Sequence, residues 1–113
     1  MSYTVNITDA AENDLRAIFS YIAFELKSKI NAVGQLERLE SEIQSLSEMP
    51  DRYRRYEAEP WRSRGLRCMP VDNYCVFYIP YHDRQTVEVI RVMYGGRDIE
   101  RILAEYFNEE FDR

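Results

Sequence analysis

Residues 74–94 read Tyr-Cys-Val-Phe-Tyr-Ile-Pro-Tyr-His-Asp-Arg-Gln-Thr-Val-Glu-Val-Ile-Arg-Val-Met-Tyr, and this stretch decides the fold. Its outer parts, 74–81 and 86–94, are rich in β-branched and aromatic residues, which favours two strands. The polar residues between them are typical of a turn and are too few for a crossover helix, so the strands should be antiparallel. Residues 65–69 predict a third strand, and the three together predict an antiparallel meander.

The N-terminal part of the sequence predicts one strand followed by a pair of helices. Residues 3–8 alternate apolar and polar side chains, which is the period of a half-buried strand. Apolar residues then recur at helical intervals over 11–26 and again over 32–46. Because only residues 27–29 join the two runs, we expect an antiparallel helical hairpin whose apolar stripes pack in the core.

Residues that start or stop helices fit this arrangement. Asp9 and Glu12 have the spacing of a capping box at the start of the first helix, and Pro50 ends the second. The glycines at 95–96 end the last strand, and Asp98 can cap a final helix. The predicted order of elements is therefore β-α-α-β-β-β-α.

Length and composition are those of one globular domain that spans residues 1–113. The chain is 45% hydrophobic and 31% charged, and no apolar run approaches the ~20 residues that a membrane span requires. The N-terminus lacks the basic start and apolar stretch of a secretory signal, so we expect a cytoplasmic protein. In a reducing compartment Cys68 and Cys75 are expected to be structural thiols rather than a disulfide or a metal-binding pair.

Charge is distributed unevenly along the chain. The net charge of −5 argues against a protein that binds nucleic acid through its overall field. Residues 52–67, however, include six arginines and only two glutamates, whereas residues 98–113 include six acidic residues and only two arginines. The arginine-rich loop also carries Tyr53, Tyr56 and Trp61, which could either stack on bases or cover the edge of the core.

Two motifs make the chain resemble a known family. The first is Arg-Val-Met-Tyr-Gly-Gly-Arg-Asp at 91–98, directly after the tyrosine-rich strand, and the second is Ala-x-x-Asp-Leu at 11–15. In order and spacing they resemble the RelE/ParE superfamily of toxins, including plasmid stabilisation proteins, over nearly the whole chain. The resemblance implies an α+β fold in which an antiparallel helical hairpin packs on a small, twisted, mostly antiparallel sheet. It also implies a neutralising antitoxin encoded beside the toxin.

Members of this superfamily have one of two different activities, and the fold alone does not determine which one a given member has. RelE-like members enter the ribosomal A site and cleave messenger RNA, whereas ParE-like members inhibit DNA gyrase without cleaving anything themselves. RNA cleavage through the 2′-hydroxyl needs a proton acceptor, a proton donor and cations that stabilise the phosphorane.

The resemblance to RelE-like nucleases places the candidate active site on the meander and just after it. We assign catalysis to Arg67, Tyr94 and Arg97, and contacts with RNA phosphate to Trp61, Arg62, Arg64 and Tyr74. The paired lysines and the helix tyrosine of RelE have no counterpart here. The only histidine, His82, falls in a turn, where a solvated residue is more common than a catalyst.

Each of the three assigned catalytic residues also has a structural alternative. Arg67 could pair with a carboxylate of the acidic tail in a weak surface ion pair. Arg97 could form a local ion pair with Asp98 at a helix start, and Tyr94 could simply pack at the end of its strand.

We therefore predict the toxin of a type II toxin-antitoxin system that inhibits growth by ribosome-dependent cleavage of messenger RNA. The alternatives are a ParE-like inhibitor of gyrase and an antitoxin-binding module that has lost its toxicity. The expected partners are the cognate antitoxin and the ribosome with its message, or gyrase in the alternative. A homodimer and a heterotetramer with the antitoxin both fit, and we expect no metal, no cofactor and no membrane association.

Overall fold

The computed structural model describes residues 2–95 and 99–111, with side chains described up to residue 105, and it has the predicted order of elements. The strands are β1 (Thr4–Ile7), β2 (Arg67–Val71), β3 (Tyr74–Tyr81) and β4 (Thr86–Tyr94), and the helices are α1 (Asp9–Ser20), α2 (Lys29–Gln44) and α3 (Ile99–Phe111). A π-helical turn (Tyr21–Glu25) extends α1, and two 3₁₀ turns (Ser45–Ser47 and Pro50–Arg52) follow α2. Within the described ranges, no helix combines the length and the apolar character that crossing a membrane requires.

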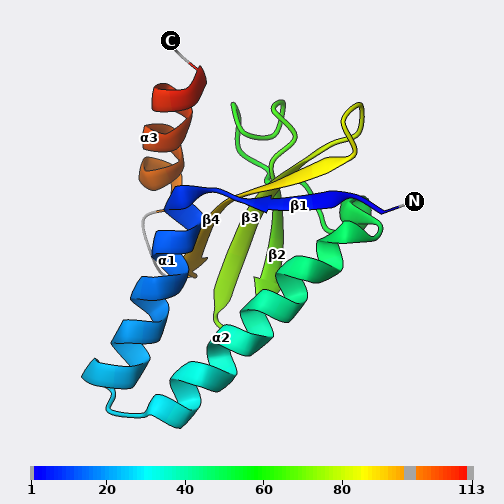
Figure 1. Cartoon of the computed structure of the whole chain (residues 1–113). Coiled ribbons are helices and arrows are strands. Elements are labelled where there is room, and N and C mark those ends of the chain that lie inside the picture. The colour runs from blue at the N-terminus through cyan, green and yellow to red at the C-terminus, as the bar shows by residue number, and fades with distance from the viewer. Residues whose placement is uncertain (1, 96–98, 112–113) are drawn as a thin grey trace.

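The four strands form one mixed sheet in the order β1-β4-β3-β2 (Figure 1). β2, β3 and β4 make the predicted antiparallel meander. β1 joins the sheet parallel to β4, with Thr4 opposite Thr86. The hairpin of α1 and α2 packs on one face, and α3 packs on the other, so the predicted α+β architecture is confirmed.

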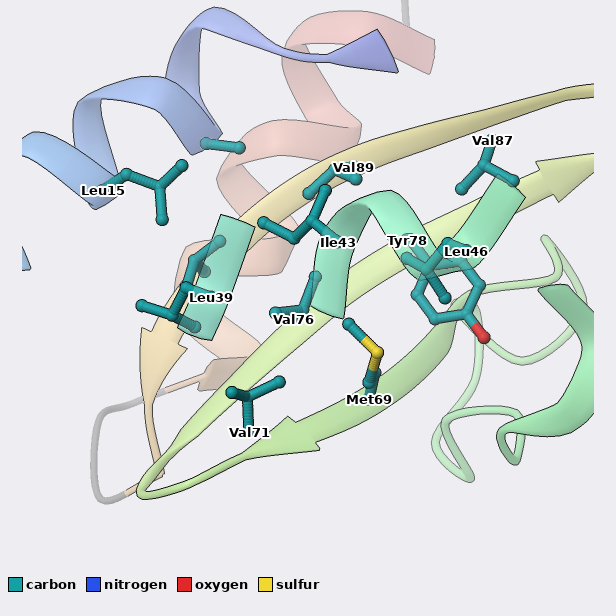
Figure 2. Packing of buried hydrophobic residues seen from close by; sticks show 12 residues of the cluster. Leu15, Leu39, Ile43, Leu46, Met69, Val71, Val76, Tyr78, Val87 and Val89 are labelled. Atoms are coloured by element: carbon teal, nitrogen blue, oxygen red, sulfur yellow. The ribbon is translucent and has the colours of Figure 1, made fainter. Parts of the chain in front are cut away.

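Alternation along the strands divides the core into two layers. On one face the strands meet α1 and α2 through Leu15, Leu39, Ile43, Leu46, Met69, Val71, Val76, Tyr78, Val87 and Val89 (Figure 2). On the other face Phe77, Ile79 and Ile90 pack with Ile102 and Leu103 of α3. Both apolar stripes predicted for the hairpin therefore contribute to packing, since burial of such side chains is the main stabilising term in a domain of this size.

α1 is capped one residue earlier than the sequence suggests, because Thr8 rather than Asp9 is the N-cap. The hydroxyl of Thr8 accepts a hydrogen bond from the amide of Ala11 at 3.2 Å. It also donates to the carbonyl oxygens of Val89 and Ile90, at 2.9 and 3.0 Å. The predicted cap at Asp9 is thus wrong, because only Thr8 can satisfy the helix and hold it to β4 together.

The outer edge of β2 is closed by residues 54–56 of the loop that precedes this strand and by a proline. The amide of Cys68 donates to the carbonyl of Arg54 at 3.3 Å, and the amide of Tyr56 donates to the carbonyl of Leu66 at 2.8 Å. The next residue of β2 that faces outward is Pro70, which has no amide to donate. This edge therefore cannot offer a regular ladder to another strand.

A buried tyrosine fastens the turn after α2 to the sheet. The side chain of Tyr78 is fully buried, and its hydroxyl donates to the carbonyl oxygen of Pro50 at 2.6 Å. Burial raises the pKa of Tyr78 to about 12 in spite of nearby arginines. One of these, Arg52, closes the end of the second helix by donating to the carbonyls of Ser45 and Glu48.

We expect Tyr78→Phe to lower the free energy of unfolding by about 1–3 kcal/mol, because it leaves the buried carbonyl of Pro50 without a donor. Since the folded-state pKa lies above the ordinary value near 10, this tyrosine's contribution is complete below pH 10 and is lost as the pH rises toward 12. Urea unfolding at neutral and alkaline pH measures both effects. The control Tyr21→Phe changes an exposed ring, and an equal loss in the two variants would contradict the assignment.

Candidate functional site

A groove of about 1260 Å³ opens between the helical hairpin and the ends of β3 and β4. The hairpin contributes Asp14, Ala17, Ile18, Tyr21, Ile22, Leu26, Ile30, Asn31, Gly34, Gln35 and Arg38, and the sheet contributes Asn73, Tyr74, Arg91, Val92, Met93 and Tyr94. This groove could not be predicted from the sequence, because its two walls are far apart along the chain.

The rim of the groove at the tip of the hairpin is apolar and exposed. Tyr21, Leu26 and Ile30 line it, and the last of these is 86% exposed. The π-helical turn widens the end of the first helix here, a feature that often marks functional sites. Exposed apolar residues grouped in one concave region are typical of a surface that binds a protein partner.

Two tyrosines stand together at the sheet end of the groove. Tyr74 and Tyr94 face each other across β3 and β4, with ring centroids 5.8 Å apart in an edge-to-face arrangement. Tyr74 is half-buried whereas Tyr94 is exposed. Burial, with the nearby Tyr94 and Tyr21, raises the pKa of Tyr74, so its hydroxyl stays protonated at neutral pH.

An ion pair joins α1 to the end of β4 on the groove wall. The two carboxylate oxygens of Asp14 accept hydrogen bonds from Nε and Nη2 of Arg91, both at 2.7 Å. The same carboxylate accepts a hydrogen bond from the backbone amide of Val92 at 2.9 Å. The hydrogen bonds that Arg91 donates to Asp14 raise the pKa of Arg91, so its guanidinium is charged throughout the physiological range.

This pair is an element of the groove wall that sequence reasoning missed. Its two members lie in the two stretches that carry the family resemblance, Asp14 in the motif at 11–15 and Arg91 at the start of the motif at 91–98. Nothing in their spacing links them, since 77 positions separate them.

A second arginine of the groove is also paired with a carboxylate. Nε of Arg38 donates to Asp72 at 2.9 Å, and the side-chain amide of Gln35 donates to the same oxygen at 2.9 Å. These hydrogen bonds lower the pKa of Asp72. The two arginines of the groove are therefore both balanced by acids, and the groove wall carries little net charge.

The predicted catalytic residue Arg67 is held in a structural network at the other end of the sheet. Its guanidinium donates to the carbonyl oxygens of Asp51 and Tyr53, at 3.2 and 2.6 Å, and forms an ion pair with the carboxylate of Asp51 at 3.3 Å. The structural alternative considered for Arg67 thus holds, but with Asp51 in place of the acidic tail. Its side chain is 15% exposed, which leaves little of it accessible to a phosphate.

The structure does not bring Arg67 and Tyr94 together. Arg67 lies opposite Tyr78 on the neighbouring strand, whereas Tyr94 lies opposite Tyr74. Four residues of strand separate these positions, which corresponds to about 13 Å. Arg97, the third predicted catalytic residue, lies outside the described residues.

The predicted RNA-binding residues are divided between two regions. Trp61 is buried in the second core layer with Tyr56, which confirms the covering role considered for the loop aromatics. Arg62 and Arg64 are exposed on the turn beside it, and Tyr74 lies in the groove. Of the seven predicted site residues, the structure brings Tyr74 and Tyr94 together and leaves the described arginines at the opposite end of the sheet.

The histidine of the hairpin turn has partners that the sequence did not suggest. His82 Nδ1 and the hydroxyl of Tyr3 are 2.7 Å apart, and His82 Nε2 lies 3.2 Å from the carboxylate of Asp51. His82 is thus tied to the N-terminal strand and, through Asp51, to Arg67. It remains exposed, at a distance from the groove.

The cysteines and acidic residues of the described chain do not form a metal centre: no three potential ligands come together there. Cys68 and Cys75 are free thiols on adjacent strands. Burial, together with the neighbouring Cys75, raises the pKa of Cys68 to about 12, which keeps it protonated and unreactive.

Sequence comparison identifies one family. Residues 5–99 match the family described as ParE toxin of type II toxin-antitoxin system, parDE. Among curated proteins, none matches this sequence.

Several solved structures share the fold. A chain of the chromosomal ParDE system of Pseudomonas aeruginosa superposes with a TM-score of 0.67 at 14% identity, covering 82% of this chain and 96% of that one. The toxin-antitoxin complex RelBE2 of Mycobacterium tuberculosis gives 0.59 at 20% identity, over 83% and 92% of the two chains. A mutant of the Escherichia coli toxin RelE in the free state gives 0.61 at 18% identity, over 96% and 98%. At these identities the likeness establishes the fold alone.

We expect Asp14→Ala to lower the free energy of unfolding by about 2–4 kcal/mol, because it leaves a mostly buried guanidinium and a backbone amide without an acceptor. Glu12→Ala, which removes an exposed pair with Arg16 on the same helix, should cost less than about 1 kcal/mol. Urea unfolding of both variants tests this. Similar losses would mean that the Asp14 pair adds nothing beyond a surface contact.

Proposed function

Because the chain belongs to the ParE toxin family of type II toxin-antitoxin systems, we propose that it arrests growth by binding a protein target rather than by cleaving RNA. The target that the resemblance to ParE-like toxins implies is DNA gyrase. A cognate antitoxin that covers the groove would neutralise the toxin.

The observation that carries this proposal is the charge balance of the groove. Arg91 is paired with Asp14 and Arg38 with Asp72, so the charge of each guanidinium is already offset by a carboxylate, which favours a neutral partner over a phosphorane. An apolar rim beside a wall with little net charge suits a protein surface better than a polyanion. The sequence favoured RNA cleavage over gyrase inhibition, whereas the charge balance of the groove supports the proposal of a protein target.

RNA cleavage is the second candidate, and one observation favours it. A shallower cleft of about 630 Å³ lies along β2 and is lined by Arg52, Arg54 and Arg55. Arg52 is engaged in capping the second helix, but Arg54 and Arg55 are exposed and face the cleft. A nuclease that used this cleft would also need a proton acceptor and a proton donor, and the residues of its lining that could serve are Tyr53, Tyr56 and Glu57.

The groove also supports the antitoxin as a partner. Antitoxins that wrap toxins use amphipathic segments, which bury apolar side chains in hollows of this kind. Its rim residues Leu26 and Ile30 are exposed in the isolated chain, where they would otherwise lower solubility.

We expect the purified chain to inhibit DNA supercoiling by gyrase and to leave translated messages intact. Supercoiling of relaxed plasmid measures the first effect, with relaxation by a type I topoisomerase as the control for DNA binding. Primer extension on messages from induced cells measures the second. Codon-phased cuts, with supercoiling unaffected, would favour the nuclease and refute the proposal.

Replacing Tyr94 by phenylalanine separates the two candidates within the cell. The change keeps the ring that packs on Tyr74 and removes only the hydroxyl. If the hydroxyl serves in proton transfer, toxicity should fall by about 100-fold or more, whereas a toxin that acts by binding should keep its activity. We expect growth arrest on induction to be unchanged, with immunoblotting to confirm equal protein levels.

A further inference from the structure

We infer that two copies of this chain form a homodimer in which the outer edges of their β1 strands pair in the antiparallel sense, with the twofold axis at Asn6. None of residues 2–8 lines the groove, so the groove of each copy stays uncovered in such a dimer. The inference goes beyond the proposed function and can fail separately from it.

β1 stands at one end of the sheet and pairs on one side only. It runs parallel to β4, and no other described strand reaches it (Figure 1). The strand at the other end of the sheet is β2, whose outer edge is closed by residues 54–56 and by Pro70. Of the two terminal strands of the described sheet, β1 is therefore the one that can extend a regular ladder.

The register of β1 fixes which of its backbone groups point outward. The amides of Thr4 and Thr8 donate to carbonyls of β4, at 2.9 and 3.1 Å. Backbone groups alternate in direction along a strand, so the residues between these two that have odd numbers face the other way. Val5 and Ile7 thus turn both the amide and the carbonyl away from β4.

These outward groups have no partner within the described chain. The amide of Tyr3, which has the same outward direction, donates to the carbonyl of Ser47 at 2.8 Å, so the turn after α2 closes the edge there. At the other end of the strand, α1 begins at Asp9. Between these limits no hydrogen bond reaches the outward amides or carbonyls of Val5 and Ile7 from any described residue.

Two copies satisfy one another in one register. When Val5 of one copy lies opposite Ile7 of the other, each such pair exchanges two hydrogen bonds, and every open group of both strands is used. Asn6 then lies opposite Asn6 of the other copy, on the twofold axis. A register with Val5 opposite Val5 would instead call on the amide of Tyr3, which is already bonded to Ser47.

The side chains of β1 suit this contact on both faces of the sheet. Val5 and Ile7 are half-buried against the core layer under the hairpin, and pairing them across the contact buries more of their apolar surface. Thr4 and Asn6 are exposed on the opposite face. The side-chain amides of the two Asn6 residues carry both donors and acceptors, so they can hydrogen-bond to each other.

The absence of charge on this strand favours a second copy as the occupant. The chain has a net charge of −5 and 31% charged residues, yet residues 2–8 include none. Two copies that repel each other elsewhere can therefore approach along β1 without placing like charges opposite each other. Charged side chains, prolines and bulges, which protect free edges in many proteins, are all missing from β1. Its short length, four residues, limits the ladder, so we expect a weak dimer that depends on concentration.

Opposite charges at position 6 test both the contact and its register. The variants Asn6→Asp and Asn6→Lys change an exposed side chain, and sedimentation velocity over about a hundredfold range of concentration measures self-association of each purified chain. In the proposed register each variant places two like charges directly opposite each other. We expect each alone to associate at least about tenfold more weakly than the wild type.

An equimolar mixture of the two variants should associate at least as strongly as the wild type, because opposite charges then meet across the axis. A mixture that associates no better than the separate variants would overturn the inference, and so would a wild-type chain that stays monomeric throughout. The controls Ser41→Asp and Ser41→Lys make the same changes of charge at an exposed position of α2 and should alter association by less than about twofold. Equal effects at positions 41 and 6 would mean general repulsion and would refute the contact at β1.

Amide hydrogen exchange on the wild-type protein gives an answer that needs no variant. The amides of Val5 and Ile7 should exchange at least about tenfold more slowly at a concentration where the dimer predominates than in the monomer. The amide of Thr4, already bonded to β4, should change much less. Unchanged exchange at Val5 and Ile7 in a sample that sediments as a dimer would refute strand pairing. None of these outcomes alters the expected inhibition of supercoiling, which tests the proposed function.

Discussion

The carboxylate of Asp14 holds together two elements of this molecule that lie far apart along the chain. It bonds the guanidinium of Arg91 and the amide of Val92, and so it attaches the first helix to the length of β4 that β1 does not cover. Because the hairpin diverges from the sheet beyond this point, the bond also sets where the groove begins. The apolar rim and the tyrosine pair both lie on the far side of it.

Arginines of the groove and of the loop end of the sheet are both balanced by groups of the same chain. In the groove each arginine is matched by an acid of another element, Asp14 or Asp72. At the loop end Arg67 contacts the carboxylate of Asp51 and two backbone carbonyls, and Arg52 donates to the carbonyls of Ser45 and Glu48. A count of arginines along the sequence therefore overestimates the cations that could meet a phosphate, since these two stabilise the fold.

Patterns of short period were sufficient to predict the elements. The β-branched and aromatic residues of 74–94 predicted both strands of the central hairpin, and helical spacing in 11–26 and 32–46 predicted the helices, because these signals depend only on residues close together in the chain. The cap at Thr8 was missed since its second role, bonding to β4, is visible only in three dimensions. The groove could not be foreseen for the same reason.

The site residues show the same limit more sharply. Tyr74 and Tyr94 could be paired from the predicted antiparallel register, and they do meet. The position of Arg67 relative to Tyr94 required the register of three strands, and its pairing with Asp51 required the path of a loop that has no periodicity. Asp14 and Arg91 each lay within a noticed motif, yet nothing local in the sequence relates a helix residue to a strand residue so distant from it.

The parallel pairing of β1 with β4 has a consequence for how the protein is made. The first strand is synthesised at once, but its partner residues begin at Thr86 of a 113-residue chain. Until those residues are made, the N-terminal strand and the two helices after it can contact only one another. The pairing of β1 with β4 joins residues that are far apart in the sequence, and such contacts form late in folding. A chain whose translation stops early can therefore build neither the sheet's centre nor the hollow beside it.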